Sequence, residues 1–581
     1  MGAKLEKLVI KNFRAIGETP VEIDLDEIVV LVGPNNVGKS SILRAYEVVM
    51  GDLVMTLDDF HLNDFNRIPE IIVHTIVDDD DKPGDLWSET LSTGKYLVKE
   101  KWVWESPGSK SVRRGFLIDE ARWSNDDDKQ KVPWGAKNFA FKHRPQPHRI
   151  SAFSTPDEQS EGIISLIDTL IKNRLESRRA DVDEESAYSK LIKSIAELQQ
   201  QVLEDGKEEI QAIEKEISKQ LSAVFQGHEI KYVTDANEGV DKSVNFFSGQ
   251  SVLTMGPNGG YQSRVENQGS GARRTLLWAA LKSLAEMGKK TEATKTKAKV
   301  VDIDSSRPQL LLMDEPEICL HPLTIREMKN VLYDLPTAGK WQVMVTTHSP
   351  QFIDFSKDNT TIVRVDSMSA GVLRGTTLYR PSETQLGADD KANLKYLNQF
   401  DPYVAEFFFG GRTIIVEGDT EYTAFNYLKS MHPDLYSDVH VIRARGKATI
   451  VSLVKILNHF GSDYSVLHDS DTPKTKKGKG NPAWGNNKNI LAAVNEKPSG
   501  TKVRLVASVL NFEDAYLHED FKDSKPYNAF ENMRNTPDSF KEVRMLLDAL
   551  LDHSKNLPDN AVEWSDIDEL EKVVNAKLTT V

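Results

Sequence analysis

A glycine-rich octapeptide near the N-terminus constrains the fold of this chain more than any other feature of its sequence. Residues 33–40 read Gly-Pro-Asn-Asn-Val-Gly-Lys-Ser, and the wholly apolar run Ile28–Val32 precedes them. This spacing matches the Walker A loop, in which backbone N–H groups wrap the phosphates of a nucleotide. The lysine of the loop contacts the β- and γ-phosphates, and the hydroxyl ligates Mg²⁺. Such a loop lies between a buried parallel strand and a helix. The motif therefore predicts an α/β domain that binds ATP and Mg²⁺.

Two further motifs at strand ends complete the predicted nucleotide site. The apolar run Leu310–Met313 ends in Asp314 and Glu315. Asp314 would hold Mg²⁺ through water, and Glu315 would polarise the attacking water as a catalytic residue. His348 follows another apolar run, Val343–Thr346, and could contact the γ-phosphate. From the loop itself we expect nucleotide contacts from Gly33, Asn35, Asn36, Gly38, Lys39, Ser40 and Ser41, with Ser40 also a metal ligand.

The segment Asn267–Arg274 contains a Gly-Ser-Gly turn before the apolar helical stretch Leu276–Leu284. N–H groups at the start of a helix can donate to a phosphate, so we assign Ser270 and Gly271 to nucleotide binding. The segment resembles a degenerate ABC signature motif, which in that superfamily completes the nucleotide site of a second subunit. The resemblance implies a homodimer or a larger homo-oligomer formed through the ATPase domains.

The first half of the chain also resembles the ATPases of the chromosome-maintenance (SMC) and RecF-like clan. Lys11-Asn12-Phe13-Arg14 stands before the phosphate loop and Glu317–Pro322 after the strand-end acids, as in that clan. From Glu161 to about Gln226, apolar residues recur among charges at three- to four-residue spacing, which predicts long amphipathic helices. This stretch could form a solvent-facing helical hairpin or a dimerisation arm.

A second α/β domain is predicted after a boundary near Pro381–Pro402, where a polar linker, Ser382–Lys391, leads into a short helix. Short apolar runs alternate beyond it with helical stretches, the pattern of a small, largely parallel sheet. The runs are Thr413–Val416, Val439–Ile442, Ser465–His468 and Val503–Val506. The last segment, Phe540–Val581, reads as a helical cap.

Acidic residues follow three of these runs. Glu417 and Glu421 follow the first run, Asp469 and Asp471 the third, and Glu513 the last. Alternate residues point the same way at a strand end, so Asp469 and Asp471 can converge. Carboxylates gathered at one sheet edge repel each other unless a cation holds them, and oxygen ligands suit Mg²⁺ or Mn²⁺. The pattern therefore predicts a divalent-metal site at this edge.

The motifs Phe407–Arg412 and Val416–Glu421, after an ABC-type ATPase, resemble the Toprim domain of OLD-family (overcoming lysogenisation defect) nucleases. Gabija-type anti-phage nucleases share this architecture. The resemblance covers most of the chain and is weak across the helical arm. It implies two-metal cleavage of phosphodiester bonds in DNA, with the five acids of the preceding paragraph as metal ligands and catalytic residues. The family also uses a late lysine against the developing charge; Lys525 fits best, with Lys541 as the reserve.

Two basic features near these acids leave alternatives open. Gly446-Lys447, after the second run, could approach a phosphate or simply form a turn. The run Lys474–Gly480 lies beside Asp471 in the sequence and could grip a DNA backbone, although a lysine run is more often solvated surface.

Composition limits the partners and the compartment. A net charge of −15 argues against simple electrostatic coating of nucleic acid, but not against DNA as a substrate, since nuclease sites concentrate carboxylates. No apolar run of about 18 residues could span a bilayer, and residues 1–14 lack the apolar core of a signal peptide. The one cysteine, Cys319, excludes an intramolecular disulfide. We therefore expect a cytoplasmic protein without membrane contact.

The 581 residues exceed a single core, so we divide the chain into domains. Residues 1–155 and 231–385 are assigned to the ATPase, 156–230 to the helical arm, and 400–581 to the Toprim nuclease domain with C-terminal helices. The leading hypothesis is an ATP-regulated, divalent-metal-dependent DNA endonuclease of antiviral defence, with room for a further defence-system partner. A non-catalytic ATP-gated sensor or scaffold is one alternative. A RecF- or SMC-like DNA repair ATPase is another, but this alternative does not explain the acidic residues of the C-terminal domain.

Overall fold

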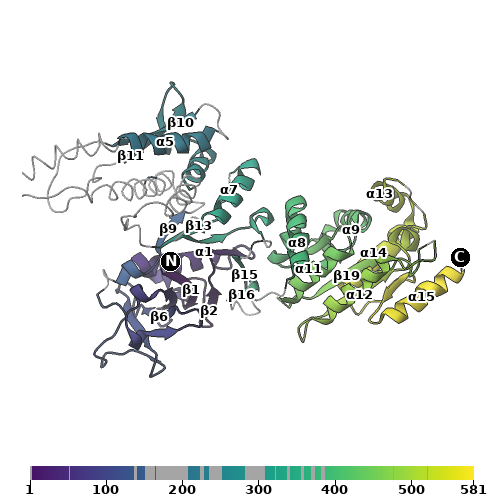
Figure 1. Ribbon diagram of the computed structural model, residues 1–581, viewed down its shortest axis with the longest axis horizontal. Helices are drawn as coiled ribbons and strands as arrows, with labels where there is room; N and C mark the ends of the chain where they lie inside the picture. The colour runs from purple at the N-terminus through teal and green to yellow at the C-terminus, as the bar shows by residue number, and fades with distance from the viewer. Residues whose placement is uncertain are drawn as a thin grey trace, which may run out of the picture. The chain divides into compact units, whose positions relative to one another are not determined.

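The computed structural model of the chain forms two compact units (Figure 1). The first unit comprises Met1–Leu31, Asn35–Phe352 and Val365–Thr376, and the second comprises Val32–Pro34, Ile353–Arg364 and Thr377–Val581. The structure describes residues 3–51, 53–136, 140–150, 164, 207–222, 228–234, 251–281, 308–318, 320, 322–336, 341–354, 357, 359–367, 373–380, 386–459, 461–475, 477–519, 521 and 523–580. Most of the predicted arm, Cys319 and part of the predicted linker lie outside these residues.

An antiparallel sheet opens the first unit. Its strands run in the order β2-β1-β4-β6-β7-β8, and β5 pairs with β6. Buried and partly exposed residues alternate along β4, as expected for a strand with one covered face. The polar stretch from Glu105 to Pro147 supplies β7 and β8. The strands are β1 (Lys4–Lys11), β2 (Val21–Asp24), β4 (Glu70–Val77), β5 (Ser88–Thr90), β6 (Tyr96–Val103), β7 (Val112–Leu117) and β8 (Arg122–Trp123).

Parallel strands form the centre of the predicted ATPase domain. The neighbouring strands β3 (Ile28–Val32), β14 (Trp341–Thr346), β13 (Gln309–Asp314) and β9 (Gln146–Ile150) are all parallel. Every residue of β3 is buried, and so are all but the first of β13 and β14, because helices and sheet cover both faces of such strands. Helix α1 (Lys39–Gly51) follows β3 directly after the glycine-rich loop. The predicted strand–loop–helix context of that loop is therefore confirmed.

The remaining described elements of the first half include one piece of the predicted arm. Helix α5 (Lys207–Ser222) buries its apolar side chains Ile213, Ile217 and Leu221, as expected for an amphipathic helix. Ser218 Oγ accepts a hydrogen bond of 3.0 Å from the N–H of Ile230 on β10, which ties this helix to a three-stranded antiparallel sheet. Residues 270–281 are helical. The other elements are β10 (His228–Thr234), β11 (Ser251–Pro257), β12 (Ser263–Arg264), α7 (Pro322–Asp334), β15 (Thr360–Ser367) and β16 (Leu373–Tyr379).

The second unit is an α/β domain with one five-stranded sheet. Its order is β18-β17-β19-β20-β21, in which the first four strands are parallel and β21 runs antiparallel to β20. The largely parallel sheet predicted from the sequence is thus confirmed. The strands are β17 (Arg412–Val416), β18 (Val439–Arg443), β19 (Tyr464–Asp469), β20 (Val503–Ser508) and β21 (Ala561–Glu563).

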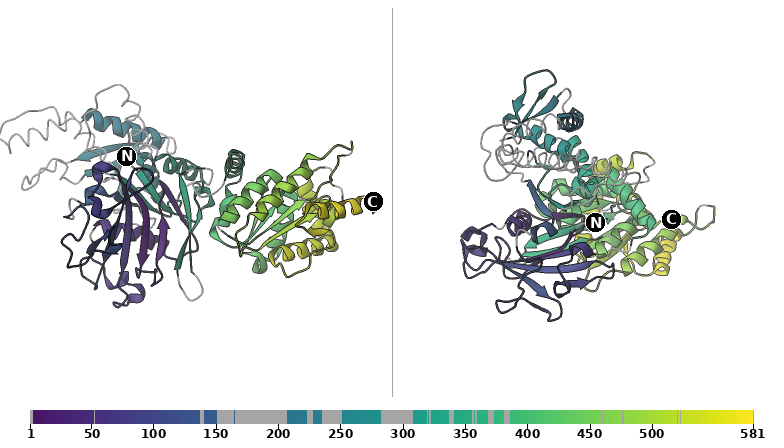
Figure 2. Two further views of the ribbon diagram at one scale, coloured as in Figure 1. Left: turned by 60° about the horizontal axis from the view of Figure 1, so that its bottom comes forward. Right: turned by 60° about the vertical axis from the view of Figure 1, so that its left-hand side comes forward.

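Helices lie on both faces of this sheet (Figure 2). Residues of α9, α13 and α14 share a buried apolar cluster with Ile414, Val416 and Leu467 of the strands, while α11 and α12 contact the sheet separately. The helices are α8 (Ala388–Phe400), α9 (Asp419–Met431), α10 (Pro433–Tyr436), α11 (Lys447–His459), α12 (Pro482–Asn495), α13 (Lys525–Asn535), α14 (Pro537–Leu551) and α15 (Ile567–Thr580). The segment Phe540–Val581 is not wholly helical, because β21 extends the sheet at its edge.

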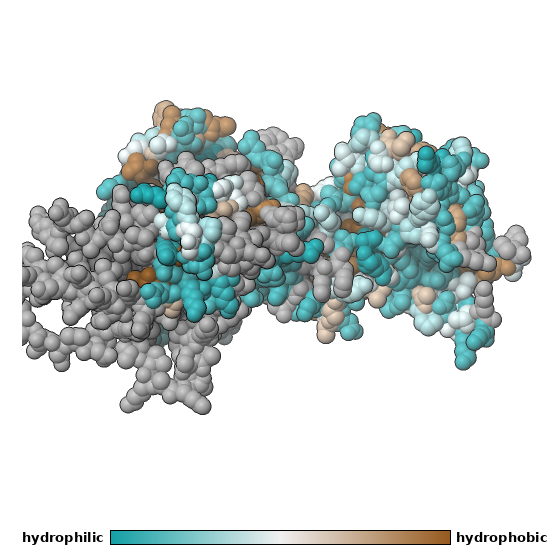
Figure 3. Space-filling view, turned by 90° about the horizontal axis from the view of Figure 1, so that it is seen from above, coloured by the Kyte–Doolittle hydropathy of each residue, from teal (hydrophilic) through white to brown (hydrophobic). Residues whose placement is uncertain are grey.

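The surface matches the acidic, polar composition. The described residues in Figure 3 are largely hydrophilic, with separate apolar patches between them. No helix in the described ranges is both long and apolar enough to cross a membrane.

Candidate functional site

The glycine-rich loop is shaped to receive an anion. Gly38 has a φ of 81°, a left-handed value that glycine adopts without strain, and Asn36 has a φ of 66°. Lys39, the first residue of α1, is 5% exposed. Burial lowers the pKa of Lys39, and the acids Glu315 and Asp314 oppose that shift. The buried ammonium of Lys39 therefore lies within the electrostatic field of the acids at the end of β13.

Asp314 lies at the centre of the nucleotide site. The Ser40 hydroxyl donates a 2.9 Å hydrogen bond to Asp314 Oδ1, and the Thr346 hydroxyl donates one of 2.6 Å to the same oxygen. The Arg149 guanidinium lies 3.6 Å from the other carboxylate oxygen. The structure thus brings together the two residues predicted to hold Mg²⁺, although they are far apart in the sequence. Arg149 was not predicted, and its only sequence signal is a basic residue on an uninterpreted strand.

Glu315 and His348 also come together. Glu315 has a φ of 46°, and its N–H donates to Thr346 O at 3.1 Å. His348 Nε2 lies 3.3 Å from Glu315 Oε1, close enough for electrostatic attraction. Among the described residues, Nε2 of His348 has no hydrogen-bond partner, so this contact lacks hydrogen-bond geometry. Burial lowers the pKa of His348, and the Lys39 ammonium lowers it further.

Glu317 fixes the backbone that carries His348. Its Oε1 accepts hydrogen bonds from the His348 N–H at 2.7 Å and from the Thr347 hydroxyl at 2.8 Å. Burial raises the pKa of Glu317. Glu317 appeared in the sequence only as part of a clan-like segment, and the structure gives it this positioning contact.

The segment predicted as a signature motif forms a helix start. Ser270 is exposed and Gly271 half-buried at the first positions of the helix over residues 270–281. Arg273 secures the turn, because its Nη1 donates to Gln268 O at 2.5 Å and its N–H donates to Gly269 O at 3.1 Å. The predicted role of Ser270 and Gly271 lies across a subunit interface and stays a prediction.

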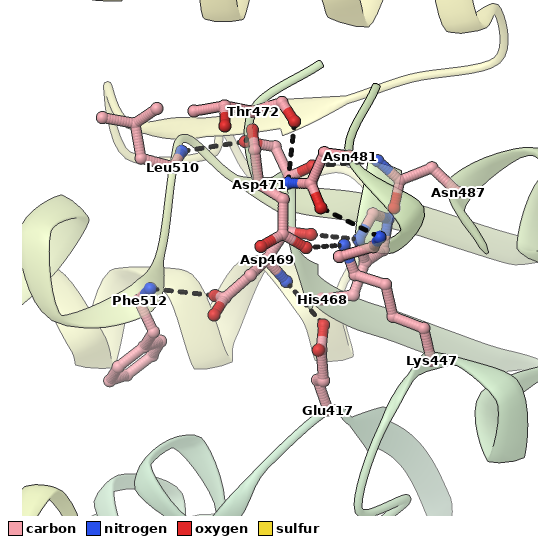
Figure 4. Close-up of polar contacts among 12 residues, drawn as sticks. Glu417, Lys447, His468, Asp469, Asp471, Thr472, Asn481, Asn487, Leu510 and Phe512 are labelled. Carbon is pink, nitrogen blue, oxygen red and sulfur yellow. Dashed lines mark hydrogen bonds and ion pairs between the residues drawn. The ribbon is translucent and has the colours of Figure 1, made fainter. Parts of the chain in front are cut away.

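In the second unit, parallel strands deliver the predicted acids to one edge (Figure 4). Glu417 follows β17, Asp469 ends the adjacent strand β19, and the Asp469 N–H donates to Glu417 Oε2 at 3.1 Å. The Phe512 N–H in turn donates to Asp469 Oδ1 at 2.9 Å. Glu421 is 3% exposed in the first turn of α9, and a Cβ at Gly418 would lie 3.2 Å from its Oε2. Glycine at position 418 thus leaves room for this carboxylate.

Glu513 belongs to a short π-helical turn, Glu513–Leu517, that follows β20. Its Oε1 accepts a 3.1 Å hydrogen bond from the Thr420 hydroxyl and lies 3.1 Å from Lys525 Nζ. Lys541, the reserve candidate for the late lysine, is exposed on α14. The geometry therefore favours Lys525 as the lysine that accompanies the acids.

Burial, together with repulsion between neighbouring carboxylates, raises the pKa of three of these acids. Burial raises the pKa of Glu421 from 4.5 to about 8, helped by Glu417 and Glu513. Burial also raises the pKa of Asp469 well above its usual range, with Glu421 and Glu417 adding to the shift. Burial raises the pKa of Glu417, and Lys447 opposes the shift. Such a site holds protons at neutral pH unless a cation takes their place.

The donor chemistry of this edge suits a hard divalent ion, since it consists of carboxylate oxygens that lack enough positive partners. In the part of the chain that the structure describes, no three Asp, Glu, His or Cys side chains are already grouped closely enough to hold one ion. The acids therefore share one edge and one electrostatic field. Carboxylate rotation would be needed for joint coordination.

Asp471 departs from the predicted geometry. Strand β19 ends at Asp469, and Asp471 has a φ of 57°, so strand alternation does not extend to it. Its N–H donates to Leu510 O at 3.1 Å, and its carboxylate accepts a hydrogen bond from the Lys447 ammonium. The two aspartates are near enough to influence each other's charge, but they have different partners. The prediction that Asp469 and Asp471 converge assumed that both continue the strand, and this assumption is wrong.

A buried histidine supports the strand end and was missed in the sequence. His468 is fully buried, and burial lowers its pKa to about 3, which leaves the ring neutral. Its Nδ1 lies 2.8 Å from Asp469 O, and Trp564 Nε1 donates to its Nε2 at 3.2 Å. The proton of the neutral ring therefore belongs on Nδ1, where it donates to the carbonyl of Asp469. The local sequence around His468 could not predict this contact, because Trp564 lies almost a hundred residues further along the chain.

The lysine-rich loop beside Asp471 is a small ordered turn. Lys474 and Gly480 form a β-bridge, and the Thr475 N–H donates to Lys479 O at 2.8 Å. Lys474, Lys477 and Lys479 are exposed, so their ammonium groups face solvent. Lys476 lies outside the described residues.

Known protein families match both units. The AAA ATPase domain family (AAA_15) matches residues 4–82 and 149–353. The TOPRIM domain of overcoming-lysogenization-defect-like proteins matches residues 408–471, the segment that carries Glu417, Glu421, Asp469 and Asp471. The two matches together contain the Walker motifs and all but Glu513 and Lys525 of the second site.

Two curated relatives resemble the chain over most of its length. The Old nuclease of Escherichia phage P2 is 22% identical over 493 residues, which is 81% of this chain and 78% of the relative. The OLD nuclease of Thermus scotoductus (strain ATCC 700910 / SA-01) is 22% identical over 487 residues, 80% of this chain and 82% of the relative. A solved Smc head bound to the C-winged helix domain of ScpA is 16% identical, covers 64% of this chain and 97% of its own, and has a TM-score of 0.39. The chain therefore joins a P-loop AAA ATPase domain to a C-terminal OLD-like TOPRIM domain, and over most of its length it is similar to OLD nucleases.

Proposed function

We propose that the nuclease is a divalent-metal-dependent DNA endonuclease whose ATPase domain regulates cleavage. One observation carries the proposal: Glu417, Glu421 and Asp469 lie at a single sheet edge, where burial and neighbouring carboxylates raise the pKa of each. A protein maintains such repulsion at a cost in stability, which a functional cation would offset. Divalent metal, Mg²⁺ or Mn²⁺, is the cofactor that this chemistry favours.

In this mechanism the TOPRIM residues have divided roles. Glu417, Glu421, Asp469, Asp471 and Glu513 would hold the metal ions. When bound, the ions would supply an activated water and stabilise the leaving oxygen of the phosphodiester. Lys525, half-exposed beside Glu513, is placed to donate to a phosphate oxygen as negative charge develops. The neutral His468 keeps the carbonyl of Asp469 occupied and so orients the end of β19.

The ATPase residues would bind ATP with Mg²⁺ and control when cleavage occurs. Lys39 would neutralise phosphate charge, while Ser40 and Asp314, already in contact, would hold the ion. Glu315 would orient the attacking water, and His348 lies within 3.3 Å of Glu315 to sense that step. Ser270 and Gly271 would complete the site of a second copy, so we propose a homodimer or a larger assembly.

For the biological role we propose defence against viral DNA in a prokaryotic cytoplasm. The support is the architecture, since Gabija-type anti-phage nucleases also join such an ATPase to a Toprim domain. A further protein of the same defence system is a natural partner for this role.

A plasmid-cleavage experiment tests the proposal. Purified protein with Mn²⁺ or Mg²⁺ should nick or linearise supercoiled plasmid, and EDTA should stop it. Glu417→Ala should lower the rate by about 100-fold or more, since a lost metal ligand should cost at least as much as a lost outer-shell residue. ATP binding should be unchanged. Glu496→Ala, at an exposed glutamate after α12, is the matched control and should cut as the wild type does.

Two results would contradict the proposal in different ways. Cleavage at the wild-type rate by Glu417→Ala would remove the acid cluster from the reaction. Absence of cleavage by the wild type on any DNA, with nucleotide-dependent assembly intact, would favour an ATP-gated sensor or scaffold instead.

A further inference from the structure

Lys447 is a buried lysine to which the proposed cleavage reaction gives no task (Figure 4). It is the first residue of α11 and is 4% exposed. Its ammonium donates a hydrogen bond to Asp471, and the two form an ion pair. Lysine is seldom buried to this extent because its ammonium loses hydration, so a charged partner is required. Asp471 is that partner.

The backbone on both sides is shaped to make this contact. Arg445 and Gly446 have φ values of 59° and 126°, and the Gly446 N–H donates to Glu417 O at 3.0 Å. The loop from β18 to α11 is thus fastened to the end of β17. Asp471, with a φ of 57°, adopts a left-handed conformation that residues other than glycine seldom take. Two loops in left-handed conformations therefore meet at the ion pair.

The ammonium of Lys447 acts on more than one acid. It is the strongest influence that lowers the pKa of Glu417, and it forms its ion pair with Asp471. Both carboxylates are candidate metal ligands. A divalent ion at this edge would need oxygens that the ammonium now occupies or neutralises.

We propose that the Lys447 ammonium and a divalent ion compete for the carboxylate of Asp471, so that Lys447 sets the metal concentration at which the site fills. This inference rests on the proposed metal-dependent cleavage. Without metal, the ammonium orients the Asp471 carboxylate and offsets part of the negative charge of the edge. When an ion binds Asp471, the ammonium leaves that oxygen. Lys447 is in this sense a positioning residue.

The test measures Mn²⁺ binding by calorimetry on the full-length protein, without DNA or nucleotide. Glu417→Ala identifies the heat that belongs to the acidic edge. Lys447→Met and Lys447→Gln, which remove the competing charge, should each bind Mn²⁺ about tenfold more tightly. Lys447→Arg keeps a cation at the position and should stay within about threefold of the wild type.

A second lysine of the same helix is the matched control. Lys455 also pairs with an aspartate, at 2.6 Å from Asp390 Oδ2, but that aspartate is not among the acids of the edge. Lys455→Met should leave Mn²⁺ affinity unchanged. Thermal unfolding of every variant checks that it is folded, and the glutamine variant serves if the methionine variant is not.

The Asp471→Asn background separates competition from a general loss of positive charge. If the effect acts through Asp471, Lys447→Met should not tighten Mn²⁺ binding in that background. Unchanged or weaker binding by the folded single variants, or full tightening in the Asp471→Asn background, would overturn the inference. Cleavage by Glu417→Ala, or no Mn²⁺ binding by the wild type, would instead overturn the proposed function on which it rests.

Discussion

The two sites of this nuclease handle buried charge in opposite ways. In the nucleotide site, hydroxyls of Ser40 and Thr346 both donate to Asp314, and an arginine and a lysine lie close to the acids. At the TOPRIM edge, burial and mutual repulsion raise the pKa of Glu417, Glu421 and Asp469. The first site is organised by its own residues, whereas the second retains a charge conflict.

This difference in how the acids are partnered indicates what stabilises each site. A hydrogen-bonded acid is held in place before any ligand arrives. A cluster of buried acids gains stability when protons or cations bind to it, so its occupancy should respond strongly to pH and to metal.

The largest effect is expected from Asp469→Asn, which removes one charge from the repelling cluster without changing its shape. Cleavage of plasmid DNA should fall by about 100-fold or more, because a ligand of the proposed metal site is lost. ATP binding, measured by fluorescent nucleotide titration, should be unchanged. Asp434→Asn, at an exposed aspartate of α10, is the control. Equal cleavage by wild type and Asp469→Asn would show that the charge conflict has no part in catalysis.

Lys525→Met should produce the next largest effect. Its Nζ lies 3.1 Å from Glu513, so it can reach a phosphate bound beside that acid. Loss of one donor to the developing charge should lower kcat by about 100-fold and leave Mn²⁺ affinity nearly constant. Lys541→Met, at an exposed lysine of α14, should cut normally. The reverse ranking of the two lysines would transfer the role to Lys541.

The pH dependence of stability is the third prediction. Glu421 has a folded pKa of about 8 against an ordinary 4.5, so between these values the folded protein holds a proton that the unfolded chain has lost. Without metal, stability from this group is full below pH 4.5 and is lost as pH rises toward 8. In EDTA, Tm should fall by several degrees from pH 5 to pH 8. Mn²⁺ should restore most of that loss at pH 8.

The control for the pH effect is Glu421→Gln, which cannot ionise. Its Tm in EDTA should vary less with pH than that of the wild type. If Tm depends on pH equally in both proteins, ionisation of Glu421 is not the cause of the loss of stability.

The nucleotide site was predictable because its signals are local. Gly33–Ser40 and Leu310–Glu315 each combine an apolar strand with the residues that the chemistry needs, and β3 and β13 have nearly the predicted bounds. The sequence did not predict that Arg149 contacts Asp314 or that Thr347 contacts Glu317. Arg149 lies on β9, whose residues gave no clear pattern, and Thr347 contacts Glu317 only because β14 and β13 are adjacent.

The TOPRIM edge was predictable in its residues and less so in its geometry. Apolar runs before Glu417 and Asp469 gave the strands, and parallel order then placed both acids at one edge. The left-handed backbone of Asp471 could not be predicted, because its φ depends on contacts with Leu510 and Lys447. The strand β21 was read as helix because Ala561–Glu563 is too short to show alternation.

Thr346→Val tests the organised side of the comparison and should have the smallest effect. Thr346 is fully buried, and its hydroxyl both donates to Asp314 and accepts from the Glu315 N–H at 3.0 Å. Valine keeps the shape but leaves these groups with one partner fewer, which should lower the free energy of unfolding by about 1–2 kcal/mol. Chemical denaturation without nucleotide measures the loss. Thr360→Val, at another buried threonine, is the control, because its hydroxyl has no hydrogen-bond partner within the described ranges. A loss in Thr346→Val no larger than in Thr360→Val would mean that Asp314 is held mainly by Ser40, and that the nucleotide site is less organised without ATP than its hydrogen bonds indicate.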